Sequence, residues 1–265
     1  MRAALAALTL CLALPGALRA QDDVPFIVTP DNVTLAMLEL AQVGPQDFVL
    51  DLGSGDGRIV ILAARRFGAR GMGVEIVSEL VERSRRNAAK AGVAERASFV
   101  EQDLFKTDLS AASVITMYLL QEVNLQLRPS LLALQPGTRI VSHDWDMGDW
   151  RPDRSITVDA PDKPVGRDKR SRLHLWVVPA RAEGRWCGTG AWREARLQLV
   201  QRHQLFDATL KLGSGAQLLA GRIEGLRLRA AGGFDALLEG GRLRVTQAGD
   251  APAMLAGAAF ERCAG

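Results

Sequence analysis

The segment that most constrains this 265-residue chain is DLGSGDG at residues 51–57, which separates an apolar run from an amphipathic one. Residues 48–50 predict a short strand, and residues 58–67 predict a helix. A glycine-rich turn between a strand and a helix lets the backbone approach a ligand closely and directs helix N–H groups toward negative charge. The spacing is G-x-G-x-G, and Arg58 stands where the dinucleotide fingerprint requires a third glycine. The turn therefore predicts a ligand site that differs from a dinucleotide site.

The chain divides into two parts with different hydrophobic periods. Strand-like and helix-like runs alternate over residues 31–182, which is typical of a parallel sheet covered by helices on both faces. We expect strands at 48–50, 71–76, 97–100, 114–118 and 139–142, a final hairpin at 155–158 and 173–178, and helices at 31–41, 58–67, 78–91 and 122–134. Residues 185–265 show short alternating runs between glycines, which predict a small antiparallel sheet or partial barrel. We therefore predict an α/β domain over 21–182 and an all-β domain over 185–265.

Three acidic residues follow three neighbouring strands of the predicted sheet. Asp51 ends the first strand, Glu75 ends the second and Asp103 follows the third. Open α/β sheets bind ligands at the carboxyl ends of their strands, so these acids are expected to lie near one ligand. Glu75 is placed to accept ribose hydroxyls, and Asp103 is placed to accept a hydrogen bond from an adenine amino group. The alternative for each is a solvated loop acid or a helix cap.

The motifs resemble those of class I S-adenosylmethionine-dependent methyltransferases. The resemblance covers residues 47–143 and rests on DLGSGDGR at 51–58, MGVEI at 72–76 and VEQDLF at 100–105. It implies a Rossmann-like seven-stranded sheet that ends in a hairpin, and S-adenosyl-L-methionine as the methyl donor. It also implies that Gly53, Ser54 and Gly55 face the methionine part, with Asp51 near its amino group, Glu75 on the ribose and Asp103 on the adenine.

A narrower resemblance points to the acceptor. VPFIVTPDNV at 24–33, DLGSGDGRIVILAA at 51–64 and TMYLLQEVNLQLRPSL at 116–131 are similar to a branch that contains mitochondrial protein-lysine methyltransferases and bacterial relatives. This implies direct in-line methylation of a protein lysine or similar amine. It also implies that residues 25–30 pack over the cofactor, which gives Thr29 a role. No Asn-Pro-Pro-Tyr-like tetrad follows the fourth strand, which argues against methylation of adenine or glutamine amino groups.

The candidate catalytic residues are Tyr118, which ends the fourth strand, and His143 and Asp144, which follow the fifth. Each can position an acceptor or take its proton. The alternatives are a structural role for His143 and a wall of the cofactor or substrate site for Tyr118.

Composition excludes several other classes of site. The three histidines are widely spaced and no C-x-x-C pair occurs, so we predict no metal. The net charge of +3 falls to +1 once Arg2 and Arg19 are removed with residues 1–20, and a chain this neutral gives no case for nucleic-acid binding. The expected partner is an acceptor protein or small molecule.

Residues 1–20 resemble an export signal in their pattern. A short positive start, an apolar run at 3–14 and a small-residue end at Ala20 predict a secretory signal cleaved near Ala20. The alternative is an uncleaved anchor helix. Export would place the mature chain in the periplasm without a membrane span, and would favour a Cys187–Cys263 disulfide over two separate thiols.

Export and catalysis are in tension, because the methyl donor is made in the cytosol. Either the signal interpretation is wrong, or donor reaches the exported enzyme, or the domain does not turn over. The alternatives to a lysine methyltransferase are therefore a small-molecule or lipid-linked methyltransferase, and an exported non-catalytic binding protein on a methyltransferase scaffold.

Overall fold

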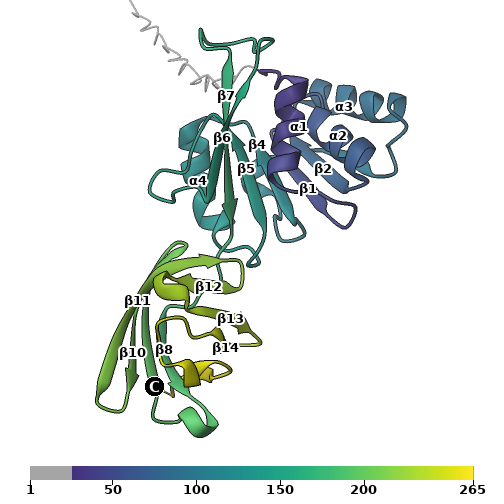
Figure 1. Cartoon of the computed structure of the whole chain (residues 1–265). Helices are drawn as coiled ribbons and strands as arrows, with labels where there is room; N and C mark the ends of the chain where they lie inside the picture. Colours follow the sequence, from purple (N-terminus) through teal and green to yellow (C-terminus); the bar gives the residue numbers. More distant parts are fainter. Residues whose placement is uncertain (1–25, 265) are drawn as a thin grey trace, which may run out of the picture.

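The computed structural model describes residues 26–264, which form a seven-stranded sheet flanked by helices and a closed antiparallel barrel (Figure 1). The predicted secretory signal at residues 1–20 lies outside the described residues. The α/β class and the antiparallel C-terminal part are both as predicted.

The first part is built on a mixed sheet. Its strands are β1 (Phe48–Leu52), β2 (Arg70–Glu75), β3 (Ala97–Glu101), β4 (Val114–Met117), β5 (Arg139–His143), β6 (Arg154–Asp159) and β7 (Arg170–Val177). Their spatial order is β3-β2-β1-β4-β5-β7-β6. Strands β1 to β5 are parallel, and β7 runs antiparallel to both β5 and β6. The strand order reverses between β1 and β4, which is where such sheets bind ligands.

Helices cover both faces of this sheet. They are α1 (Asp31–Leu40), α2 (Arg58–Phe67), α3 (Ser78–Lys90) and α4 (Gln121–Leu131). One apolar core joins α1 to Val49, Val114, Val141 and Leu173. Side chains that alternate with these, such as Leu50, pack in the core on the α4 side. This alternation decides which face of the sheet each site residue occupies.

Helix α4 ends earlier than its apolar pattern predicts. We expected it to reach Leu134, but it ends at Leu131, two residues after Pro129. The Leu132 amide still donates four residues back, but the two amides after it bond three residues back: Ala133 N–H donates to Ser130 O, and Leu134 N–H donates to Leu131 O. The chain therefore tightens into turns ahead of β5.

The second part is a closed eight-stranded barrel. Its strands are β8 (Gly184–Gly188), β9 (Arg196–Arg202), β10 (Leu205–Leu212), β11 (Gly215–Glu224), β12 (Arg227–Ala230), β13 (Asp235–Glu239), β14 (Arg242–Gln247) and β15 (Ala259–Arg262). Pairing of β15 with β8 closes the ring. Apolar side chains fill the interior, Trp186, Phe206 and Phe260 among them. A small sheet or partial barrel was expected, and the closure leaves no free sheet edge.

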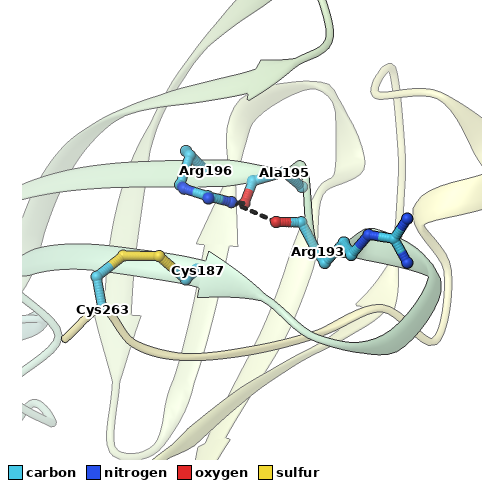
Figure 2. Close-up of a disulfide and its surroundings, with 5 residues drawn as sticks. All are labelled: Cys187, Arg193, Ala195, Arg196 and Cys263. Atoms are coloured by element: carbon cyan, nitrogen blue, oxygen red, sulfur yellow. Dashed lines mark hydrogen bonds between the residues drawn. A yellow bond between two sulfur atoms is a disulfide. The ribbon is translucent and has the colours of Figure 1, made fainter.

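A disulfide lies at the seam of the barrel. Cys187 on β8 is bonded to Cys263, which directly follows β15 (Figure 2). These are the cysteines for which we expected a bridge. The bond ties the last strand to the first strand of the barrel.

The barrel packs against the edge of the sheet where β5 begins, away from the tip of the β6–β7 hairpin (Figure 1). Gly225 lies against Gly137, two residues before β5. Ala180 N–H donates to Gly225 O at 2.7 Å, and Arg222 pairs with Asp153. Because parallel strands end at the opposite edge, the barrel lies away from the carboxyl ends of the strands.

Candidate functional site

The glycine-rich turn connects β1 to α2 and adopts a conformation that glycine favours. Gly53, Gly55 and Gly57 have φ angles of 75°, 54° and 81°. The amides of Gly53 and Ser54 both donate to Val74 O at 2.9 Å, which holds the turn against β2. A Cβ atom at Gly55 would lie 2.1 Å from the ring of Phe26. The turn therefore needs glycine both for its backbone angles and for close contacts.

Asp51 is a buried acid at the base of this turn. Its side chain is 3% exposed, and the Thr116 hydroxyl bonds its Oδ1 at 2.7 Å. Burial raises the pKa of Asp51 to about 7; the Thr116 hydrogen bond opposes this shift, and the negative charges of Glu75 and Asp56 add to it. A cation bound next to the carboxylate would reverse the shift.

Glu75 organises the turn through its own carboxylate. Its Oε2 accepts the Gly55 amide at 2.9 Å, while Oε1 accepts the amides of Ile76 and Val77 at 2.9 and 3.1 Å. A carboxylate has about four acceptor positions, so these bonds leave room for a ligand hydroxyl.

Asp103 caps a short helix. Its Oδ1 accepts the Phe105 amide at 2.9 Å, and its Oδ2 lies 3.5 Å from Lys106 Nζ. The capping interaction is the alternative that the sequence left open for this acid. It places Asp103 beside the carboxyl end of β3, as expected.

The N-terminal segment of the described chain packs over the turn. Thr29 is buried, and its carbonyl accepts a 2.8 Å hydrogen bond from Arg58, the first residue of α2. Arg58 also pairs with Asp56 at 2.7 Å. The pattern of residues did not identify Phe26, because a lone aromatic residue ahead of a helix carries no periodic signal.

These features fit S-adenosylmethionine. Ser54 Oγ is buried and has no hydrogen-bond partner among the described residues, and the Asp51 carboxylate receives only the Thr116 hydroxyl from a side chain. Both groups can satisfy a ligand that carries an ammonium group. Beside them, Ile76, Val77 and Phe105 expose large apolar surfaces at the ends of β2 and β3. A flat aromatic base would cover such surfaces.

A row of polar side chains continues from Asp51 across the sheet. Thr116 of β4 and His143 of β5 each lie two residues beyond a valine that packs in the core with α1. Ser171 of β7 lies two residues before Leu173, which packs in the same core. Because side chains alternate along a strand, these residues share one face with Asp51. We call Asp51, Thr116, Tyr118, His143 and Ser171 the polar row. Strands lie about 4.8 Å apart, so the row crosses from the glycine turn to the hairpin within about 15 Å.

The structure brings the three predicted catalytic residues together. The Tyr118 and His143 rings stack with centroids 3.9 Å apart, and His143 Nε2 lies 3.5 Å from Asp144 Oδ2. Burial raises the pKa of Tyr118 to about 12, and the nearby Asp144 carboxylate adds to the rise. Tyr118 is therefore a neutral hydroxyl at physiological pH.

His143 supports the Tyr118 ring from the interior of the protein. It is fully buried, and its Nε2 lies 2.8 Å from Ser171 Oγ. Burial lowers its pKa to about 4; the charge of Asp144 opposes this shift and that of Lys163 adds to it. A neutral, buried imidazole supports Tyr118 by stacking, in line with the structural alternative considered above.

Two residues that contact this cluster were not predicted from the sequence. Ser171 bonds His143, and Lys163 Nζ lies 2.6 Å from Asp144 Oδ2. Both come from the β6–β7 hairpin, whose residues carried no recognisable motif. Asp144 itself has a φ of 64°, a conformation uncommon outside glycine, and its Oδ1 accepts the Arg172 amide at 3.0 Å.

Over residues 26–264, no group of three or more His, Cys, Asp or Glu side chains is arranged to hold a metal ion. Within the same residues, the helices are too short or too polar to cross a bilayer.

Comparison with known proteins shows that this part of the chain is similar to methyltransferases. Residues 51–154 match the model of the ANTKMT methyltransferase domain. The chain is 46% identical over 138 residues to a protein-lysine N-methyltransferase of Saccharolobus islandicus, covering 51% of this chain and 86% of that protein. It is 35% identical over 132 residues to the mouse adenine nucleotide translocase lysine N-methyltransferase, covering 49% of this chain and 57% of the mouse protein. The chain thus spans little more than half the length of that animal relative.

A solved structure is also similar to this chain, and it too is that of a methyltransferase. A protein from Salinibacter ruber, described as an RNA methyltransferase in complex with S-adenosyl-L-homocysteine, is 48% identical and matches with a TM-score of 0.54. The match covers 58% of this chain and 95% of that one. The chain belongs to the class I S-adenosylmethionine-dependent methyltransferases, in the family of the ANTKMT-type protein-lysine methyltransferases.

Proposed function

We propose that this protein N-methylates lysine side chains of a protein acceptor. The observation that carries the proposal is the cluster of half-buried Tyr118 and Asp144 with buried His143, in which Tyr118 and His143 belong to the polar row that begins at Asp51. A carboxylate beside a neutral hydroxyl is suited to an amine nucleophile. Lysine methylation by the Saccharolobus and mouse relatives supports the same acceptor.

We propose roles for the cofactor residues from their positions. Asp51 and Ser54 would hold the ammonium end of S-adenosylmethionine, with Gly53 and Gly55 providing close backbone approach. Glu75 would bind the ribose and Asp103 the adenine, while Thr29 would help to close the site from the N-terminal segment. When bound, the cofactor supplies a methyl group on a positively charged sulfur, which an amine nitrogen can take by in-line displacement.

The acceptor must lose a proton before it reacts, because an ammonium nitrogen has no free electron pair. In our proposal, Asp144 attracts the ammonium and takes part in passing its proton to solvent. The neutral Tyr118 hydroxyl then orients the amine by hydrogen bonding. His143 and Ser171 hold the Tyr118 ring in place, which fixes the acceptor close to the cofactor side of the row.

Other acceptors are distinct outcomes of one experiment. The full chain would be incubated with radiolabelled methyl donor and an extract from a strain that lacks the protein. Label in methyl-lysine after acid hydrolysis would support the proposal. Label in RNA would favour the activity named for the Salinibacter relative, and label in a small or lipid-linked molecule would favour the second enzyme hypothesis. Absence of label would favour a non-catalytic binding protein.

The matched controls are Asp51→Ala and Asp108→Ala. Asp51 is buried at the glycine turn, whereas Asp108 is an exposed acid that accepts a hydrogen bond from the amide of nearby Ser110. Loss of label with the first variant alone would tie transfer to the cofactor site.

We also propose that the mature protein is exported to the periplasm after cleavage near Ala20. The pattern of residues 1–20 supports this, and so does the bonded Cys187–Cys263 pair, since disulfides persist in oxidising compartments. The test fuses residues 1–25 to a reporter that is active only after export. An inactive reporter would overturn the proposal.

A further inference from the structure

Lys163 lies where a lysine acceptor would be expected to bind. Its Nζ is 2.6 Å from Asp144 Oδ2 and donates a 2.8 Å hydrogen bond to the Arg170 carbonyl. The residue is only 9% exposed, although lysine is among the residues least often buried. Its ammonium group is therefore held by two oxygen acceptors within the candidate catalytic cluster.

The surroundings leave space for a second lysine side chain to enter. A cavity of about 330 Å³ is lined by Asp144, Lys163 and Ser171 together with Thr157 of β6. This is within the size range of small-ligand pockets. The cavity gives a ligand from solvent access to the carboxylate that Lys163 contacts.

The segment that carries Lys163 is loosely built. Residues 160–169 connect β6 to β7 without helix or strand, and Lys163 is tied down by its own ammonium and by a backbone bond from its amide to Ala160 O. Lys169 Nζ also donates to the Lys163 carbonyl. Withdrawal of the Lys163 side chain therefore breaks few contacts outside the Asp144 pair.

We propose that Asp144 Oδ2 and the Arg170 carbonyl form the subsite for the acceptor's ammonium group, and that Lys163 occupies it until an acceptor lysine displaces it. The inference rests on the proposed lysine methylation. Two ammonium groups repel each other at one carboxylate, so an acceptor and Lys163 compete. The apparent affinity for the acceptor is then reduced by the fraction of molecules in which the subsite is free.

The binding test uses the full chain without cofactor and n-butylammonium, which has the chemistry of a lysine side chain. Lys163→Ala should bind this probe about tenfold more tightly than the wild type does, and should gain more thermal stability from the same concentration of it. The double variant Lys163→Ala/Asp144→Asn should lose the binding. Lys90→Ala is the matched control, because Lys90 is an exposed lysine at the end of α3 and should behave as the wild type.

A kinetic test uses Lys163→Gln, which removes the charge but keeps most of the side-chain volume and so protects the fold. Its KM for a lysine peptide should fall about tenfold if Lys163 fills about nine-tenths of the subsites in the wild type. An unchanged or raised KM, or a fall in kcat alone, would show that Lys163 positions Asp144, and would overturn the proposal.

The two tests separate this inference from the proposed function. If butylammonium binds Lys163→Ala but no lysine is ever methylated, the subsite is supported and the proposed function fails. If lysine is methylated but neither variant changes amine binding or KM, the proposed function holds and the subsite is refuted.

Discussion

Replacing Asp51 with asparagine should stabilise the cofactor-free protein at neutral and alkaline pH while abolishing cofactor binding. Asp51 is almost fully buried, and burial raises its pKa from 3.8 to about 7. The folded protein therefore favours the neutral acid, and ionising this side chain costs stability. Asparagine is neutral at every pH and keeps an oxygen for Thr116.

The size of the stabilisation follows from the raised pKa of Asp51. Because the pKa is raised in the folded state, the stability associated with protonated Asp51 is fully present below about pH 4 and is lost as the pH rises through about 7. A rise of the Asp51 pKa from 3.8 to about 7 corresponds to about 4 kcal/mol of unfolding free energy. Asp51→Asn should thus match the wild type near pH 4 and exceed its free energy of unfolding by up to about 4 kcal/mol at pH 8.

The assay is denaturant unfolding of the cofactor-free proteins at pH 4, 6 and 8. The matched control is Asp47→Asn at the other end of β1. Burial raises the pKa of Asp47, but hydrogen bonds from Ser113 and Gly44 and the charge of Arg139 outweigh it and lower that pKa below 3.8. Asp47 therefore stabilises the fold above about pH 4 and loses this contribution as the pH falls, so its removal should destabilise the protein at pH 8.

A gain for Asp51→Asn that does not grow between pH 4 and pH 8 would refute the reasoning. Calorimetric titration supplies the second readout. S-adenosylmethionine affinity of the wild type should fall about tenfold per unit below pH 7, as the carboxylate takes up a proton. The variant should show no binding at any pH.

Three further predictions concern the glycine-rich turn, the Tyr118 hydroxyl and the barrel disulfide. Gly55→Ala should lose cofactor binding by calorimetry, because it strains a φ of 54° and places Cβ against Phe26. Tyr118→Phe should lower kcat about tenfold or more and leave the cofactor Kd within about twofold, since it removes only the hydroxyl. Reduction of the Cys187–Cys263 bond, or Cys187→Ser, should destabilise the protein by about 2–5 kcal/mol in urea unfolding, because the bond restrains the unfolded barrel.

The sequence by itself was enough to predict the sheet and to place Asp51 and Glu75 at one edge of it. Strands and helices of residues 31–182 alternate with clear periods, and local periodicity is set by which side chains a strand or helix buries. Asp51 and Glu75 could be assigned to one site because parallel strands end at a common edge. Topology alone therefore brings them together, whatever the details of packing.

The acceptor side depended on tertiary structure. The sequence placed Tyr118 and His143 at strand ends but could not show that their rings stack or that His143 is fully buried. It gave no sign of Lys163 or Ser171, because they come from a hairpin that pairs with β5 across about thirty residues of chain. Contacts of this range follow from strand register, which no local pattern encodes.

The barrel shows the same division. Alternating runs with glycine turns were enough to predict antiparallel strands, and two cysteines near the ends of the segment suggested a bond between them. Whether such strands form an open sheet or a ring depends on the tilt and stagger that all eight adopt together, which is a property of the assembled sheet. Pairing of β15 with β8 is therefore decided only in three dimensions. The periods of side chains determine which elements form, and the packing of those elements determines which side chains meet.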